Sequence, residues 1–217
     1  MEFRLLEPLP ADTRRELLAR ARRRRFAAGE VIFHEGDPGD AMHLLAKGHV
    51  AIRVTTPLGD TATLRVLRAG DHFGELSVVS PAPRNATIVA LDATETLVVH
   101  RDDVDQLRRD HPAVDRFLVD TLVQEVRRLS ILLAEALYLP VEKRTWRRLL
   151  ALTTIYARDT DPTTVIPLTQ EDVAGIVGTT RPTINRLLRD AERDGLLRMS
   201  RGRIDVIDRA ALERRSR

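Results

Sequence analysis

A helical stretch between two prolines most limits how this 217-residue chain can fold. After Pro112, apolar residues recur at alternating spacings of three and four positions up to Leu139, and Pro140 then stops or kinks the helix. This a/d seam consists of Val119, Leu122, Val126, Leu129, Leu133 and Ala136. Such a seam predicts a helix that pairs with its own copy, so we expect a homodimer through residues 112–139. The alternative is an amphipathic helix packed on its own domain.

Residues 26–100 alternate short aliphatic runs with glycine, aspartate and proline. The runs lie at residues 30–33, 42–45, 49–54, 62–67, 86–90 and 95–99. Many short strands separated by turn signals predict a small sandwich or jelly-roll barrel. A second stripe on the long helix is expected to cover this barrel: Phe117, Leu118, Ile131 and Leu132. Before the strands we predict a helix over residues 10–25 that ends in Arg22 to Arg25, because cations favour a helix C-terminus.

The segment from Leu168 to Leu188 has the pattern of a helix-turn-helix. Thr169 can cap the first helix with Asp172 in the reciprocal position, Gly178 permits a tight turn, and Thr180 can cap the second helix. The buried face of the second helix would consist of Ile184, Leu187 and Leu188. Between Pro140 and this segment we expect a helix over residues 141–157 and a loop containing Asp159, Asp161 and Pro162.

The second helix of this segment carries side chains suited to DNA. Arg181, Asn185 and Arg186 project from its N-terminal half, the part that meets base edges in the major groove. Thr180 and Thr183 suit phosphate contacts, and a following hairpin carries Arg201 at its tip, as in a winged helix. From Pro140 onward 16 Lys and Arg face 11 Asp and Glu, a balance of +5, whereas the preceding residues carry 19 against 21, or −2. The alternative is an ordinary helical pair with exposed arginines.

A second motif lies in the strand-rich part, at residues 70–77 and 81–87. Gly74 permits close approach of backbone to a ligand, and Glu75 can accept a hydrogen bond from a ribose hydroxyl. Ser77 and the amides of a short helical turn can face an anion, and Arg84 can pair with a phosphate as a fork. The alternative is a surface turn with a structural Glu–Arg pair.

Composition excludes several classes of protein. The chain has no cysteine, which rules out disulfides, a thiol nucleophile and a thiolate-held iron–sulfur cluster. No apolar run reaches the length of about 20 residues that spans a bilayer, and the first residues lack the apolar region of a signal peptide. No Walker loop, dinucleotide fingerprint or nucleophile–base pair is recognisable. We therefore expect a cytoplasmic protein that is not an enzyme, contacts no membrane and holds no metal.

Together the two motifs resemble those of the CRP/FNR family of transcription regulators, named after the cyclic-AMP receptor protein. The resemblance covers almost the whole chain. It rests on Gly29-Glu30, His34-Glu35-Gly36-Asp37, Lys47-Gly48, Ala69-Gly70-Asp71, the Phe73-Gly74-Glu75-Leu76 cassette with Arg84, the long helix and the helix-turn-helix. The resemblance implies an α+β chain with three parts. These are a cyclic-nucleotide-binding β-roll (jelly roll) over 1–111, a dimerisation helix over 112–139 and a winged helix-turn-helix DNA-binding domain over 140–217.

By the same resemblance, the phosphate arginine falls on Arg84 and the ribose-binding glutamate on Glu75. The remaining implied ligand-binding residues are Gly74, Leu76, Ser77, Asn85 and Ser130. Two positions depart from the family. Leu129 stands where the cyclic-AMP receptor carries the first of two adenine-reading hydroxyls, so cyclic GMP, another nucleotide or weak ligand dependence are alternatives. Pro182 replaces a common Glu, and because proline cannot accept a hydrogen bond from cytosine, one base-pair preference should be relaxed or different.

The sequence thus predicts a ligand-gated, dimeric, sequence-specific DNA-binding transcription regulator that responds to a cyclic nucleotide, with cyclic AMP as first choice. Its expected partners are double-stranded palindromic DNA and a second copy, with RNA polymerase as a further candidate. One alternative is a dimeric DNA-binding protein with a vestigial or differently liganded sensor, including a haem-binding one, since six histidines are present. A remote alternative is a cupin-like metal enzyme, which needs a His-x-His pair that the sequence lacks.

Overall fold

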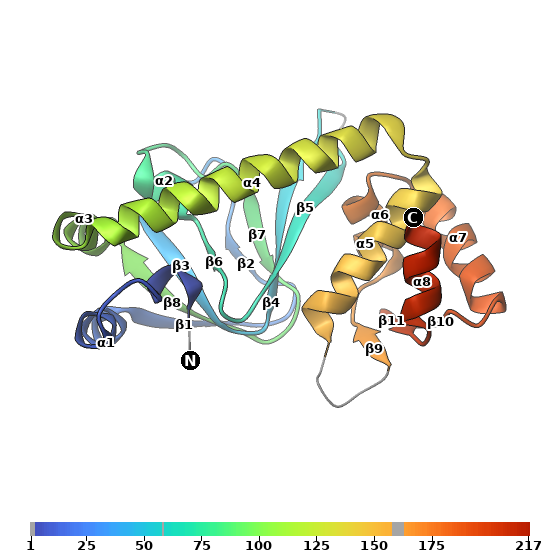
Figure 1. Ribbon diagram of the computed structural model, residues 1–217, viewed down its shortest axis with the longest axis horizontal. Helices are drawn as coiled ribbons and strands as arrows, with labels where there is room; N and C mark the ends of the chain where they lie inside the picture. Colours follow the sequence, from blue (N-terminus) through green and yellow to red (C-terminus); the bar gives the residue numbers. More distant parts are fainter. Residues whose placement is uncertain (1–2, 58, 158–162) are drawn as a thin grey trace. The chain divides into compact units, whose positions relative to one another are not determined.

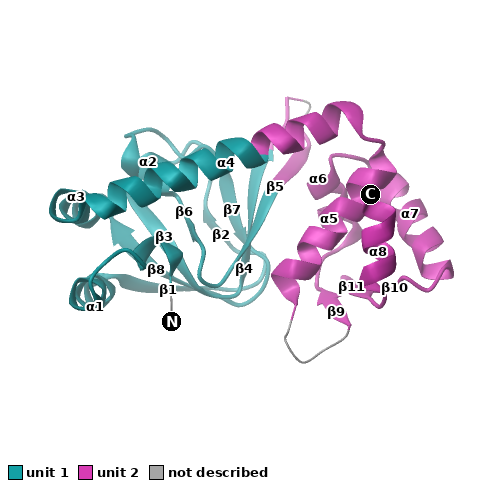
Figure 2. Cartoon of the chain, in the orientation of Figure 1, with its two compact units in different colours: residues 1–54, 64–128 teal, residues 55–63, 129–217 magenta. Residues whose placement is uncertain are grey.

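The computed structural model describes residues 3–57, 59–157 and 163–217 (Figure 1). The predicted loop at Asp159, Asp161 and Pro162 lies outside these residues. The chain forms two compact units (Figure 2). Unit 1 comprises Met1–Val54 and Leu64–Arg128, and unit 2 comprises Thr55–Thr63 and Leu129–Arg217. The long helix α4 (Pro112–Tyr138) contributes to both, because the division falls after Arg128.

Among the described residues eight short strands form the β-roll, and six of them coincide with the predicted aliphatic runs, whereas Arg22–Phe26 and His72–Phe73 were not predicted as strands. The eight strands are β1 (Arg22–Phe26), β2 (Val31–Phe33), β3 (Ala41–Lys47), β4 (His49–Thr55), β5 (Thr61–Arg68), β6 (His72–Phe73), β7 (Thr87–Ala90) and β8 (Thr94–His100). They pair in two four-stranded sheets, one in the order β1-β8-β3-β6 and the other in the order β2-β7-β4-β5. This arrangement confirms the predicted fold class for this part of the chain. Strand β3 runs antiparallel to β8, and β4 runs antiparallel to β7.

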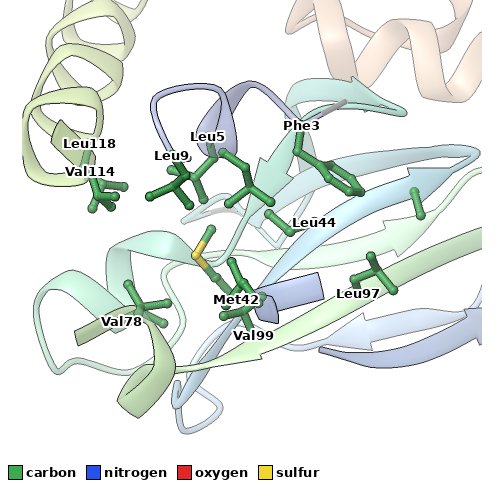
Figure 3. Close-up of a cluster of buried hydrophobic side chains, with 14 residues drawn as sticks. Phe3, Leu5, Leu9, Met42, Leu44, Val78, Leu97, Val99, Val114 and Leu118 are labelled. Atoms are coloured by element: carbon green, nitrogen blue, oxygen red, sulfur yellow. The ribbon is translucent and has the colours of Figure 1, made fainter. Parts of the chain in front are cut away.

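Strand β3 separates two hydrophobic clusters because its side chains alternate between the two faces of its sheet. Met42 and Leu44 face one cluster, which also contains the N-terminal residues Phe3 and Leu5 (Figure 3). Leu45 faces the other cluster, inside the roll. The outer cluster is completed by helices η1 (Arg4–Leu6), α1 (Ala11–Arg20), α2 (Glu75–Val79), α3 (Arg101–Asp110) and the first turns of α4.

The predicted helix over residues 10–25 is wrong at its end. Helix α1 stops at Arg20, and the arginine run forms strand β1, which pairs with β8. The cause is a partner distant in sequence: Arg23 and Arg25 both form ion pairs with Glu95 of β8. Because β1 is an edge strand, its charged side chains remain solvated, and only Phe26 is buried.

Unit 2 contains the predicted helix-turn-helix and hairpin, together with two elements that the sequence did not reveal. Its helices are α5 (Val141–Tyr156), α6 (Gln170–Val177), α7 (Arg181–Arg193) and α8 (Arg209–Ser216). Its strands are β9 (Thr164–Ile166), β10 (Leu197–Ser200) and β11 (Arg203–Val206), arranged in the order β10-β11-β9. Strand β9 and helix α8 were not predicted. The first has only three residues, and the second carries no amphipathic stripe that marks it.

The seam on α4 and its neighbouring stripe differ in burial. Leu118 is buried against the outer cluster, as predicted, whereas Ile131 is 59% exposed. A helix turns 100° per residue, so Leu132, two heptads after Leu118, returns to nearly the same side and Ile131 does not. Val119, Leu129 and Leu133 of the seam are exposed. Within the described parts of the chain, no helix has the length and apolar character needed to cross a bilayer.

Candidate ligand site and DNA-binding surface

The turn between β6 and α2 places glycine where only glycine fits. Gly74 has a left-handed backbone, with a φ of 81°. A Cβ atom at this position would lie 2.7 Å from Nη1 of Arg84. The absence of a side chain therefore lets the Arg84 guanidinium reach the backbone at the start of α2.

Arg84 is a buried cation held by carbonyl oxygens, with 6% of its surface exposed. Its Nη1 donates to the carbonyl of Gly74 at 3.0 Å, and its Nη2 donates to the carbonyl of Ala41 at 2.6 Å. The guanidinium also lies 4.2 Å from the centre of the Phe33 ring. Among the described residues, Nε of Arg84 has no hydrogen-bond partner. A buried guanidinium with an unused N–H is well suited to bind an anion.

The charges around Arg84 have opposing effects on its protonation. Burial lowers the pKa of Arg84, while the carboxylates of Asp40, Asp37 and Glu75 raise it. An arginine stays protonated despite such a shift, since its ordinary pKa exceeds 12. Burial therefore makes the cation a stronger partner for an incoming phosphate rather than removing its charge.

The other predicted ligand residues have differing exposure. Glu75 is half-buried, Ser77 is buried, and Leu76 and Asn85 are exposed. Ser77 packs against Gly39, where a Cβ atom would lie 2.3 Å from that of Ser77. The structure thus brings the cassette, Arg84 and residues 39–41 together. Ser130 is an exposed residue of α4 that belongs to unit 2.

Sequence reasoning missed Arg101 as a neighbour of this site. It is the first residue of α3, and its Nη2 donates to the carbonyl of Gly39 at 2.5 Å and to that of Ser77 at 2.6 Å. The only signal in the sequence is a cation at a helix N-terminus, where the macrodipole disfavours positive charge.

The histidines in the roll include one that belongs to its core. His43 stacks on the Phe73 ring with centroids 5.0 Å apart, and its Nδ1 forms a 3.1 Å hydrogen bond with Oγ1 of Thr96. Burial, aided by the charge of Arg84, lowers the pKa of His43 to about 3. Across residues 3–57, 59–157 and 163–217, no three His, Asp or Glu side chains gather in a way that could hold a metal ion.

In unit 2, local signals position the helix-turn-helix as predicted. Oγ1 of Thr169 accepts a hydrogen bond from the amide of Asp172 at 3.1 Å, and Oδ2 of Asp172 accepts one from the amide of Thr169 at 2.9 Å. Gly178 has a φ of 73° at the end of α6. Helix α7 buries Ile184, Leu187 and Leu188. Thr180 is the N-cap residue of α7, but its side chain makes no capping bond and instead lies 3.1 Å from the hydroxyl of Thr183.

The predicted DNA-contacting cations are free for a partner. Arg181, Arg186 and Arg201 are exposed, and none of them forms a hydrogen bond or ion pair with another described residue. Asn185 is half-buried, and its Oδ1 accepts a 3.1 Å hydrogen bond from Nε of Arg189. The amide nitrogen of Asn185 still has two hydrogens that it can donate.

Two of these cations line the same groove, which has a volume of about 390 Å³. It lies between the start of α6, the first residue of α7 and the β10–β11 wing, and its wall includes Arg181 and Arg201. Gln170 and Arg203 also line the groove and were not singled out from the sequence. Their signal is positional: Gln170 is the first residue of α6, and Arg203 follows the wing turn at Gly202. A cationic groove at helix N-termini suits a phosphate backbone.

Comparisons with known proteins identify the two domains. Residues 23–111 match the family model of the cyclic nucleotide-binding domain, and residues 143–215 match that of the Crp-like helix-turn-helix domain. The cyclic AMP receptor protein of Thermus thermophilus is 31% identical over 88% of this chain and 86% of its own length. The CRP-like cAMP-activated global transcriptional regulator of Mycobacterium tuberculosis is 29% identical over 88% of this chain and 87% of its own length.

Solved structures share the fold. The crystal structure of the Thermus thermophilus catabolite activator protein is 30% identical, with a TM-score of 0.56 over 98% of this chain and 97% of that one. The c-di-GMP responsive regulator CLP of Xanthomonas campestris has a TM-score of 0.79 over 92% of this chain and 100% of that one. At 21% identity it supports the fold alone. The chain therefore belongs to the CRP/FNR family, as a DNA-binding transcription regulator, not an enzyme, with a cyclic-nucleotide-binding domain ahead of its helix-turn-helix.

Proposed function

We propose that this protein is a cytoplasmic homodimer whose affinity for palindromic DNA is set by a cyclic nucleotide, with cyclic AMP as first choice. The observation that carries the proposal is Arg84, a buried cation with an unused N–H beside the glycine turn that begins α2. The proposal assigns residues 1–111 to sensing, 112–139 to dimerisation and 140–217 to DNA binding. RNA polymerase is a further candidate partner.

In the proposed complex, the phosphate of the nucleotide binds Arg84 and the backbone at Gly74. Two of the five N–H donors of Arg84 bond carbonyls, so a phosphate oxygen can bind one of the remaining donors or replace a carbonyl partner with a stronger charge-assisted bond. Glu75 accepts a hydrogen bond from the ribose hydroxyl, and Ser77 with the neighbouring Leu76 and Asn85 completes the cassette. Ser130 of α4 is assigned to the base in this complex, since Leu129 has no hydroxyl.

The proposed dimer interface is the seam on α4. Val119, Leu129 and Leu133 expose 57%, 43% and 59% of their surfaces although they are large and apolar. Their heptad spacing matches what a parallel pair of helices buries. A second copy of the same helix is the partner that satisfies this pattern, because it supplies an identical seam.

For DNA, the proposal places α7 of each protomer in a major groove. Arg181, Asn185 and Arg186 would contact base edges, and Thr180, Thr183 and Arg201 would contact phosphates. Two such helices in a symmetric dimer fit half-sites about 34–36 Å apart, which is why we expect a palindromic operator. A ligand can change this affinity only by binding one conformation more tightly than another.

The test is fluorescence anisotropy on a DNA site selected from a random pool, without nucleotide and with cyclic AMP, cyclic GMP or c-di-GMP. We expect tighter DNA binding with one of them, and loss of that effect in Arg84→Ala but not in Arg109→Ala, whose exposed side chain bonds Gln106. Equal affinity under all conditions would reject ligand gating. It would favour the second candidate, a dimeric DNA-binding protein whose sensor is vestigial, a reading supported by the carbonyl partners that Arg84 already has.

A further inference from the structure

Two arginines connect the same two backbone segments in unit 1. Arg84 bonds the carbonyls of Ala41 and Gly74, and Arg101 bonds those of Gly39 and Ser77. Residues 39–41 are therefore joined to the cassette twice, once before α2 begins and once within it. The two guanidinium groups repel each other, since the charge of Arg101 lowers the pKa of Arg84.

Arg101 supplies a hydrogen bond that the helix cannot make for itself. The carbonyl of Ser77 would ordinarily accept from the amide four residues later, but that residue is Pro81, which has no N–H. The Nη2 atom of Arg101 carries two hydrogens, and it donates to Ser77 at 2.6 Å and to Gly39 at 2.5 Å. A cation at the C-terminal end of a helix is also favoured by the helix dipole.

The position of Arg101 in its own helix indicates the same role. It is the first residue of α3, where the dipole disfavours a cation, and the next two residues are acidic, as the dipole favours. Its backbone amide donates to the carbonyl of Asp40 at 2.8 Å, so main chain and side chain both hold the 39–41 segment. Gly39 also packs directly on Ser77, so the 39–41 segment and α2 lie in contact where Arg101 bonds both.

We propose that Arg101 is a positioning residue of the ligand site, which holds α2 against residues 39–41 when a phosphate takes Arg84 from its carbonyl partners. This inference rests on the proposed binding of a cyclic nucleotide. Without a ligand, Arg84 and Arg101 both hold α2 against residues 39–41. In the complex the ligand competes with the carbonyls for Arg84, and the side chain of Arg101 still joins the cassette to residues 39–41.

The experiment compares full-length wild type with Arg101→Met, Arg101→Lys and the control Arg109→Met, an exposed arginine of the same helix. Isothermal titration with cyclic AMP and cyclic GMP measures affinity, and amide hydrogen exchange at Val79 and Ser80 measures how firmly α2 is held. We expect Arg101→Met to weaken binding about tenfold, the scale of one hydrogen bond to a charged group. Exchange at α2 should rise mainly in the liganded state. Arg101→Lys should restore most of both, and Arg109→Met should match wild type.

Unchanged affinity together with unchanged exchange in the liganded Arg101→Met variant would overturn the inference. A wild type that binds neither nucleotide would instead reject the proposed ligands. Arg101 would then be tested in an Arg84→Met background, where no phosphate is needed to remove the first connection. Adding Arg101→Met should accelerate exchange at Val79 and Ser80 beyond Arg84→Met alone, and equal rates in the two would show that Arg101 does not hold α2.

Discussion

Glu135, near the end of α4, accepts a 2.6 Å hydrogen bond from Nη2 of Arg148 in α5, across the break at Pro140. Arg147 of α5 donates to the other carboxylate oxygen at 2.8 Å. Glu135 is buried, so its charge depends on these two partners. The last turns of α4 are therefore braced to α5, in agreement with the division of the chain after Arg128 rather than at the proline.

Removal of this charge should destabilise unit 2. Glu135→Gln keeps the size of the side chain but leaves two arginines without their carboxylate, and we expect a loss of about 2 kcal/mol in unfolding free energy. Urea unfolding followed by the fluorescence of Trp146, the only tryptophan in the chain, reports on this unit. The control is Asp120→Asn, an exposed carboxylate on the same helix. Equal midpoints for the two variants would show that the ion pairs of Glu135 with Arg147 and Arg148 do not stabilise this unit.

The same pair should make stability sensitive to acid. Burial opposes ionisation of Glu135, but hydrogen bonds and charges from Arg147 and Arg148 outweigh it and hold the pKa below the usual value. A lowered carboxyl pKa stabilises the fold above the unfolded-state value near 4.3, and this contribution disappears as pH falls through the native pKa. The difference between wild type and Glu135→Gln should therefore be largest near pH 7 and shrink below about pH 4.

His43 should give the roll a separate acid sensitivity. Its pKa falls from 6.5 to about 3 through burial, so between these values the unfolded chain binds a proton that the native state does not. Stability should then decrease by about 1.4 kcal/mol for each pH unit below 6.5. His43→Phe should have a shallower slope in urea unfolding monitored by circular dichroism, whereas the exposed His34→Gln should keep the slope of wild type. Parallel slopes in all three proteins would refute this origin.

Gly74→Ala separates backbone strain from the contact with Arg84. Its φ of 81° is strained for any other residue, and its Cβ would press on Nη1 of Arg84. Gly29→Ala is a matched control, with a φ of 83° and open space around the new atom. Both should lose about 1 kcal/mol from the backbone term. Only Gly74→Ala should also weaken binding of the cyclic nucleotide, which titration calorimetry measures, and equal affinities would disprove the role of the contact.

The two N-cap threonines of the helix-turn-helix should behave differently. Thr169→Ala removes a complete capping box and should cost about 1 kcal/mol of stability. Thr180→Ala removes a hydroxyl that makes no capping bond, so its cost in stability should be smaller while its affinity for DNA falls. Thermal unfolding and DNA titration on the same preparations distinguish the two effects. The reverse order of stability losses would contradict the observed geometry.

A charged residue introduced into the seam on α4 tests whether this seam is the dimer interface. Leu133→Glu places a carboxylate at an exposed seam position and should dissociate the proposed dimer, because two like charges would meet at the interface. Gln124→Glu introduces the same residue at an exposed polar position of the helix and should leave the dimer intact. Sedimentation velocity measures the oligomeric state of both variants. A dimeric Leu133→Glu protein would place the interface elsewhere.

Sequence predicted best what depends on neighbours along the chain. The capping box of Thr169 and Asp172, the turn at Gly178 and the start of α7 follow from residues within one or two turns. Strand β1 was missed because its arginines also suit a helix end, and Glu95, which decides between the two, lies about 70 residues away. Arg101 was missed because its partners are backbone carbonyls, which have no sequence signature.

The brace at Glu135 decides where this protein can be cut and rejoined. A chimaera joined at Pro140 would give the new DNA-binding domain arginines without their carboxylate, or leave a buried carboxylate without its arginines. A junction after Arg128 keeps the ion pairs intact on one side. An exchange between relatives that preserves these ion pairs therefore moves residues 129–138 of α4 together with the winged helix, so the recombination boundary belongs inside a continuous helix.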